Sequence, residues 1–216
     1  MEKIHLEEDM KEKLAPIHTL QHNRIRIQEN LEEFLIELFG LENLDRESIE
    51  VLGSRSTKEP LADQIDHDNI HGWLESHLIS NEKRMAILAR KIIDTSDEDA
   101  LILAYAEFGK RLGDSLKADV QYHDTQELYR ALSAVLLDGM PCDKISVLTE
   151  AGDDLLIWHN VRDIHGRYFE EQNLPAELFY TLRGAFMSSL VKSLGNLTYS
   201  LDFTSKGIEN RVEVRK

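Results

Sequence analysis

The sequence has few of the residues that build a disulfide-linked or membrane-bound protein. Among its 216 residues there is one cysteine, Cys142, which excludes an internal disulfide framework and a zinc cluster built on cysteines. No apolar run approaches the roughly 20 residues that a membrane-spanning helix needs. The opening stretch MEKIHLEEDMKEKLAP is acidic and polar, unlike a signal peptide. We therefore expect a soluble protein of the reducing cytoplasm.

Positive charge is also scarce. The chain has 25 Lys and Arg residues against 40 Asp and Glu residues, a formal net charge of -15. The acidic excess lies in residues 1–160, whereas residues 161–216 are nearly neutral. Such a surface repels a phosphate backbone and an anionic membrane, so we expect neither nucleic acid nor membrane as a partner. A hydrophobic content of 42% is ordinary for a globular protein.

Apolar residues recur at helical spacing through most of the first 140 residues. Ser96 and Asp99 have the spacing of a capping box, and Asp124 is placed to cap the last of these helices, which we expect to reach Gly139. The segments expected to be helical are 17–40, 60–80, 81–94, 96–116 and 124–139.

After Pro141 the apolar period changes to two. DKISVLTEAGDDLLIWHN predicts a hairpin with Gly152 in its turn, and the closing stretch predicts a second hairpin that turns near Gly207. Between them, LPAELFYTLRGAFMSSLVKSLG predicts a helix. The expected fold is α+β and predominantly helical, with the two hairpins packed on a buried helix. Residues 1–95 would form an acidic helical region and 96–216 an α+β ligand-binding domain, either separately or as one continuous domain.

The helix expected over 174–194 is apolar nearly all round, which predicts burial on both sides. Phe186 and Met187 lie on its two faces. Gly184 and Ser188, four residues apart, would leave room for a ligand or another backbone to come close. Arg183 would be the counter-charge for a carboxylate. Alternatively, this is only the central core helix.

Aromatic and basic residues gather in WHNVRDIHGRYFEE, where a strand should pass into a helix. Trp158, His165 and Tyr168 belong to this stretch, which we expect to border a pocket. The alternative is a loop that amphipathic residues anchor. The residues expected to bind a ligand are therefore Trp158, His165, Tyr168, Arg183, Gly184, Phe186 and Met187.

Two histidine pairs at helical i,i+4 spacing raise the possibility of a metal site: His18 with His22, and His67 with His71. Neither pair has the glutamate of a metalloprotease motif, and a solvated polar face explains the second pair equally well. We assign no metal, no cofactor and no catalytic residue from the sequence. Gly-rich phosphate loops and a nucleophile elbow are absent.

The hairpin DKISVLTEAGDDLLIWHN, the helix that follows it and the closing FTSKGIENRVEV carry a family resemblance. Over roughly residues 100–216 the chain resembles 4-vinyl-reductase-type small-molecule-binding domains, relatives of the haem nitric-oxide sensor fold and of aminothiazoline-carboxylate hydrolase-like proteins. The resemblance implies a pocket between the core helix and the sheet. Arg211 stands where that family has a cysteine, and HNVRDIHGRY lacks the other one. This departure favours a binding role over thiolate or metal chemistry.

We therefore expect a cytoplasmic small-molecule-binding or sensory protein, rather than an enzyme, that buries an apolar or partly anionic molecule and forms a homo-oligomer, such as a homodimer. Two alternatives from other classes stay open. The chain could be a helical protein–protein interaction or dimerisation module that uses its acidic helices. It could also be a hydrolase or a His/Asp metalloprotein.

Overall fold

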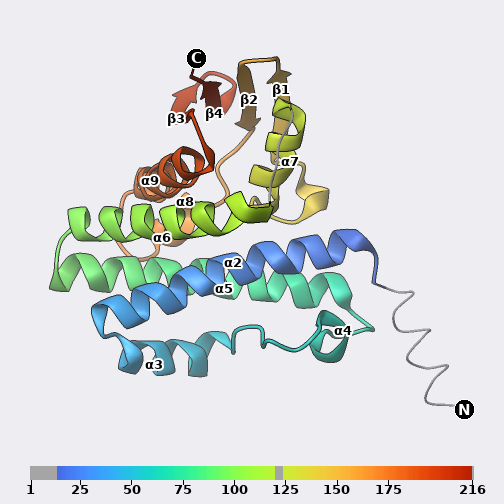
Figure 1. Cartoon of the computed structure of the whole chain (residues 1–216). Coiled ribbons are helices and arrows are strands. Elements are labelled where there is room, and N and C mark those ends of the chain that lie inside the picture. Colours follow the sequence, from blue (N-terminus) through green and yellow to red (C-terminus); the bar gives the residue numbers. More distant parts are fainter. Residues whose placement is uncertain (1–13, 120–123, 216) are drawn as a thin grey trace, which may run out of the picture.

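The computed structural model describes residues 14–119 and 124–215, and it confirms the α+β class (Figure 1). Helices occupy the chain up to the first strand, and further helices lie between the second and third strands. The helices are α2 (Pro16–Phe39), α3 (Glu42–Leu52), α4 (Leu61–Gln64), α5 (Ile70–Thr95), α6 (Glu98–Asp119), α7 (Thr125–Val135), the 3-10 turn η1 (Pro141–Asp143), α8 (Gly166–Glu170) and α9 (Ala176–Leu194). The strands are β1 (Ser146–Ala151), β2 (Leu155–Asn160), β3 (Leu197–Thr204) and β4 (Gly207–Val214).

The two predicted hairpins join into one antiparallel sheet in the order β1-β2-β4-β3. The last strand, β4, pairs with both β2 and β3, so it lies inside the sheet. Leu156 of β2 is opposite Val212 of β4, and Val212 is also opposite Tyr199 of β3. These residues share one face because side chains alternate along a strand. This face covers the helices.

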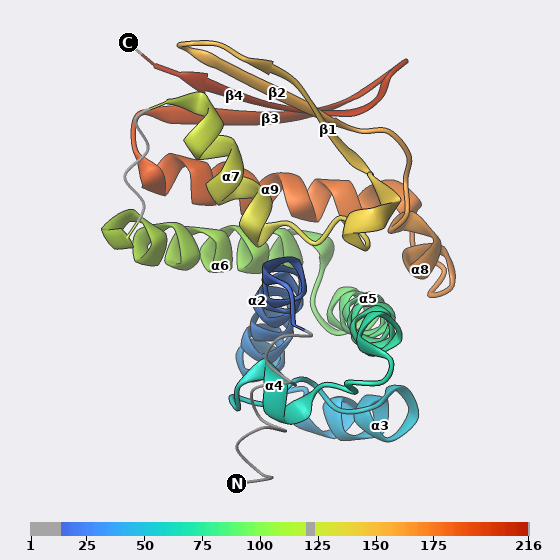
Figure 2. The ribbon, with the colours of Figure 1, turned by 90° about the vertical axis from the view of Figure 1, so that its right-hand side faces the viewer.

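The elements form successive layers (Figure 2). The sheet lies over α9 and α7, α6 lies below α9, and α2 and α5 run side by side further down, with α3 and α4 at the far end. In this view α2 and α5 are seen nearly along their axes, whereas α6 and α9 are seen from the side. Two helical layers therefore cross beneath the sheet. Within the described ranges, no helix is long and apolar enough to cross a membrane.

One hydrophobic core spans both regions expected from the sequence. Leu31 and Leu35 of α2 belong to the same buried cluster as Leu156, Trp158 and Val212 of the sheet. The helices before residue 95 thus pack on the elements after it. Burial of apolar side chains from both parts ties them together.

Helices α6 and α9 approach closely at two glycines of α6. A Cβ atom added at Gly109 would overlap the backbone carbonyl of Phe186, and one added at Gly113 would lie 2.6 Å from the carbonyl oxygen of Leu190. Only hydrogen fits at these positions. The sequence predicts such a close approach at Gly184 instead.

Several predicted helix boundaries are wrong. Segments 60–80 and 81–94 were expected as two helices, but α5 runs unbroken from Ile70 to Thr95. Its start is capped by Asn69, whose side-chain oxygen accepts from Gly72 N–H at 3.2 Å. Asn81, where the second helix was expected to begin, lies inside α5 and donates from its amide to the buried carboxylate of Glu32. The helix α3 was not predicted.

The caps of α6 and α7 and the end of α7 can also be compared with the prediction. The carboxylate of Asp97, rather than Ser96, accepts from Ala100 N–H, at 2.7 Å. Asp124 caps α7 as predicted, accepting from Glu127 N–H at 2.7 Å. This helix ends at Val135 and not at Gly139, and the chain beyond it turns inward. Both leucines that follow, Leu136 and Leu137, are buried in the core.

Candidate functional site

Four charged side chains from four distant segments meet inside the protein. His165 precedes α8, and its Nδ1 lies 2.7 Å from Oε1 of Glu82 on α5. On the other side, its Nε2 lies 3.7 Å from Oδ1 of Asp138. Arg183 of α9 binds the same Asp138 carboxylate with both terminal nitrogens, the second at 3.1 Å. We call Glu82, Asp138, His165 and Arg183 the buried quartet.

Charge alternates along the buried quartet, so its members neutralise one another. Burial alone would lower the pKa of His165, but Glu82 and Asp138 outweigh it and raise this pKa to about 9. Burial would likewise raise the pKa of Asp138, but Arg183 and His165 hold it well below its usual range. Arg183 therefore already has its carboxylate within the protein. The expectation that it awaits the carboxylate of a ligand is wrong.

A chain of hydrogen bonds connects the buried quartet to the sheet. Ser146 Oγ donates to Asp138 and accepts from Asn160 Nδ2 at 3.2 Å. Asn210 then donates to Asn160 at 2.8 Å, and the Tyr199 hydroxyl donates to Asn210 at 2.8 Å. The chain thus passes from β1 through β2 and β4 to β3. It satisfies polar groups that would otherwise be costly to bury.

A pocket of about 390 Å³ opens beside the buried quartet, and we call it the junction pocket. It lies where α5, the segment around η1 and the connection from β2 to α8 meet. Glu82 reaches it from the quartet. The aromatic and basic stretch at this strand-to-helix connection predicts a pocket here. The lining residues are Glu75, Leu78, Ile79, Glu82, Gly139, Met140, Asp143, Arg162, Asp163, Ile164, Arg167 and Tyr168.

Two acidic groups of the junction pocket are engaged with the backbone. Asp163 Oδ1 accepts from the backbone N–H groups of His165 and Gly166, at 2.8 and 2.9 Å, and from the Tyr180 hydroxyl at 2.6 Å. Asp143 accepts from the N–H of Met140 at 2.8 Å. These bonds shape the loops, and they leave less of either carboxylate for a ligand.

The basic groups of the junction pocket are more accessible. The Arg162 side chain is 62% exposed, and its Nη2 lies 4.0 Å from Asp143 Oδ1, the outer limit of an ion pair. Arg167 is also exposed, and its guanidinium lies 4.6 Å from the centroid of the Tyr168 ring and donates to its hydroxyl. Both guanidinium groups therefore stand at the rim with donors facing solvent.

The residues expected to bind a ligand do not form one site. Tyr168 lines the junction pocket and His165 lies in the quartet behind it, but Arg183 and Phe186 line a separate internal cavity of about 40 Å³. That cavity has room for only a few water molecules. Met187 is fully buried in the core. The two remaining predicted residues each line a further hollow. Trp158 lines one between α7 and the sheet, and Gly184 lines one between α9 and β3.

Helix α9 is less completely buried than its sequence predicts. Thr181, Ser188 and Lys192 are exposed along one line of the helix, and Gly184 is half-buried between them. A Cβ atom added at Gly184 meets nothing within 4 Å. No backbone among the described residues approaches Gly184, so the predicted backbone contact there is wrong, whereas room for a ligand stays a prediction.

Of the two predicted histidine pairs, His18 and His22 share α2 as expected, but the second pair is rearranged. His67 lies in the turn before α5, and its Nε2 is 2.7 Å from the carbonyl oxygen of Ala62. His71 lies within α5, so the two histidines do not share a helical face. His71 Nε2 instead lies 3.1 Å from Nε2 of His18 on α2. Across the described ranges, no group of three or more metal-ligating side chains is close enough to enclose an ion.

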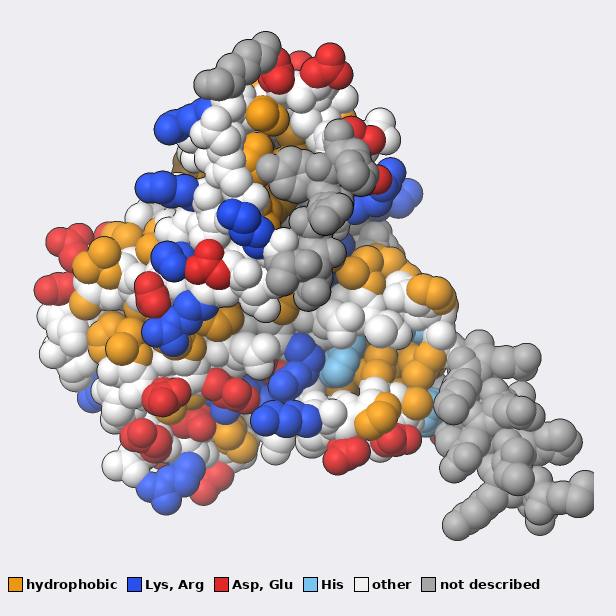
Figure 3. All heavy atoms as spheres, in the orientation of Figure 1, with side chains coloured by type: hydrophobic (Ala, Val, Ile, Leu, Met, Phe, Trp, Pro, Cys, Tyr) orange, Lys and Arg blue, Asp and Glu red, His pale blue; other side chains and the backbone are white. Residues whose placement is uncertain are grey.

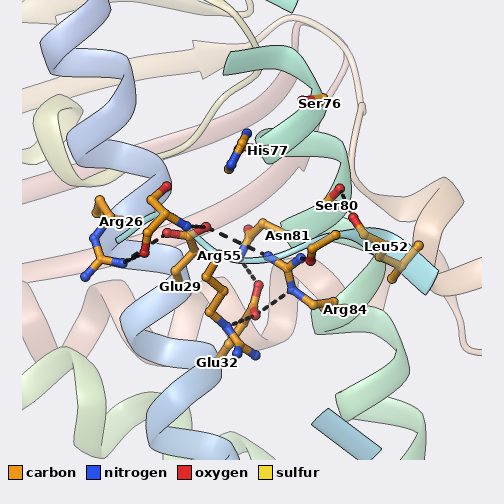
Figure 4. Close-up of polar contacts among 12 residues, drawn as sticks. Arg26, Glu29, Glu32, Leu52, Arg55, Ser76, His77, Ser80, Asn81 and Arg84 are labelled. Atoms are coloured by element: carbon orange, nitrogen blue, oxygen red, sulfur yellow. Dashed lines mark hydrogen bonds and ion pairs between the residues drawn. The ribbon is translucent and has the colours of Figure 1, made fainter. Parts of the chain in front are cut away.

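A second buried ionic cluster joins α2, α5 and the segment after α3 (Figure 4). Glu32 is fully buried and accepts from Nε of Arg55 at 2.6 Å and from Nε of Arg84 at 2.8 Å. Glu29 accepts from the N–H of Ser56 at 3.0 Å. Burial raises the pKa of Glu32, and Arg84 and Arg55 oppose that rise. This cluster fixes the helical layers rather than forming an open site.

Comparison with protein-family models, with curated proteins and with solved structures finds no match for this chain. The resemblance to 4-vinyl-reductase-type domains therefore stays a prediction.

The sequence did not reveal Glu82 and Asp138 as members of the candidate site. The one local signal for Asp138 was its position directly after the apolar run AVLL, where the helical pattern ends.

Proposed function

We propose that the chain binds a small organic acid in the junction pocket. The observation that carries this proposal is the pairing of an apolar wall with two accessible guanidinium groups, Arg162 and Arg167, at the rim of one pocket. The apolar part of a ligand would occupy the wall. Its carboxylate would lie between the arginines, which suit planar anions.

The size of the pocket supports this proposal. A volume of about 390 Å³ lies in the range of roughly 300–1,000 Å³ that is usual for small-molecule sites. The wall contains Leu78, Ile79, Met140, Ile164 and the buried ring of Tyr168. Apolar surface of this kind contributes affinity, and the few polar groups determine the orientation.

The charge of the pocket limits which acids fit. Glu75, Glu82, Asp143 and Asp163 also line it, and they would repel a ligand with several negative charges. Glu82 is neutralised by His165, and Asp143 and Asp163 accept backbone hydrogen bonds. A monocarboxylate is thus the favoured class of ligand.

Binding is favoured over catalysis by the state of the nearby histidine. A general base needs a pKa close to the working pH and a free lone pair. The pKa of His165 is about 9, so its imidazole stays protonated near neutrality between Glu82 and Asp138. This group stabilises charge and does not accept a proton.

Calorimetric titration with two probes of similar shape tests the proposal. Benzoate and benzyl alcohol share an aromatic ring and differ in charge. We expect benzoate to bind and benzyl alcohol to bind at least about tenfold more weakly, because only the carboxylate engages the arginines. Equal binding of the two probes would argue against an anion site.

Variants locate the binding. The double variant Arg162→Gln/Arg167→Gln should lose benzoate binding and keep the fold, since both side chains are exposed. Arg130→Gln removes an exposed arginine of α7, outside the pocket, and is the matched control. Benzoate affinity that survives the double variant, or that falls as much in the control, would contradict the proposal.

A further inference from the structure

A histidine from each of two helices meets at the end of the helical layer, outside the junction pocket. His18 belongs to the first turn of α2 and His71 to the first turn of α5. Their Nε2 atoms are 3.1 Å apart, and the ring planes are inclined by 67° with centroids 5.1 Å apart. Figure 3 shows histidine side chains at the surface where these two helices begin. Counting only the described residues, His71 is exposed and His18 is half-buried.

The separation of the two nitrogens suits a shared metal ion. Imidazole nitrogens bind zinc at about 2.0–2.1 Å, so two of them on one ion lie about 2.9 Å apart at a right angle and about 3.4 Å apart at a tetrahedral angle. The observed 3.1 Å falls between these limits. The separation therefore already fits shared coordination, and the two rings need to turn so that both Nε2 lone pairs point at the ion rather than at each other.

We propose that His18 and His71 form a two-histidine clamp for a divalent transition metal such as zinc. Each ring binds through Nε2 and carries its proton on Nδ1, and water molecules complete the coordination. The bound ion replaces the imidazole–imidazole hydrogen bond and links α2 to α5.

The protonation state supports this role. Partial burial, and then the nearby His71, lower the pKa of His18. A neutral imidazole is the form that binds a metal.

The surroundings predict an exchangeable site rather than a permanent one. Nδ1 of His18 is buried and has no hydrogen-bond partner among the described residues, so no carboxylate or carbonyl orients this ring from behind. Such partners usually strengthen metal binding by about 10–100-fold. Metal should therefore bind on addition and be lost on dialysis against a chelator.

Zinc titration of the full chain, followed by calorimetry and by thermal unfolding, tests the clamp. We expect one zinc per chain in this site and a higher melting temperature with zinc, because the ion binds the folded form. His18→Gln and His71→Gln should each weaken zinc binding by about tenfold or more and abolish the rise in melting temperature. The double variant, which keeps neither ligand, should bind zinc no more tightly than either single one.

His67→Gln and His77→Gln are matched controls, since both histidines lie near the same end of α5 but are bonded to backbone carbonyl oxygens. They should bind zinc as the wild type does. The proposal is overturned if the wild type binds no zinc, or if both clamp variants bind it within about twofold of the wild type. Loss of binding in the controls to the same extent would also overturn it.

Discussion

His165 Nδ1 lies 2.7 Å from Glu82 Oε1, which joins the loop before α8 to the middle of α5 across 83 positions of sequence. Both side chains are buried. The contact places a protonated imidazole against the wall of the junction pocket. The same contact therefore contributes to the stability of the fold and holds the wall of the junction pocket in place.

Stability should depend on the charge of His165. Its pKa is raised from 6.5 to about 9 in the folded protein, so its contribution is fully present below about pH 6.5 and is lost as the pH rises through about 9. The shift corresponds to about 3 kcal/mol at most. Urea unfolding across this window should show a fall in the free energy of unfolding that His165→Gln flattens.

His67→Gln is the control for that series, because His67 lies outside the buried quartet. It should keep the slope of the wild type. A wild-type stability that does not change between about pH 6.5 and 9, or an equal slope in His165→Gln, would contradict the coupling.

Two glycine substitutions should have opposite signs. Gly109→Ala drives a methyl group into the carbonyl of Phe186 and should destabilise the protein by about 1–3 kcal/mol. Gly184→Ala meets nothing within 4 Å and should stabilise α9 by about 0.5–1 kcal/mol. Thermal and denaturant unfolding measure both. Stabilisation by Gly109→Ala would show that α6 and α9 pack more loosely than described.

The same glycines show what the sequence could predict. Both positions lie within predicted helices, and helical periodicity alone does not tell which neighbour each glycine faces. The hairpins were predictable because their alternation and the turn at Gly207 are local signals. Glu82 was not, because a carboxylate on an amphipathic helix resembles a solvated one until its partner His165 is placed beside it. The candidate site was predictable only as far as the stretch that contains Arg162, His165 and Tyr168.

Removal of the closing hairpin should destroy the fold. Deleting residues 197–216 removes β3 and the inner strand β4, including the buried Asn210 and Val212. The deletion exposes the apolar surface of α9 that β3 and β4 cover, and this exposed surface should cause aggregation or loss of cooperative unfolding. Phe203, near the end of β3, is 61% exposed. Phe203→Ser is therefore the control and should stay folded, and a soluble, cooperatively unfolding truncation would show that the hairpin is dispensable.

Breaking the second ionic cluster should be costly. Arg84→Ala leaves the buried carboxylate of Glu32 with one fewer partner and should destabilise the protein by about 3–5 kcal/mol. Arg90→Ala, also on α5, removes only a solvent-accessible ion pair with Asp94 and should change the free energy of unfolding little. Denaturant unfolding compares the two. Equal losses of unfolding free energy in the two variants would mean that burial of the ion pairs does not determine how much they contribute to stability.

The most direct test of the binding proposal is to map where benzoate binds by amide chemical-shift changes in a nuclear magnetic resonance titration. The proposal predicts saturable changes that cluster at Ile79, Ile164 and Tyr168, around the junction pocket, and that vanish in Arg162→Gln/Arg167→Gln. Saturable changes centred instead on the hollow between α9 and β3, or no changes at saturating benzoate, would contradict it.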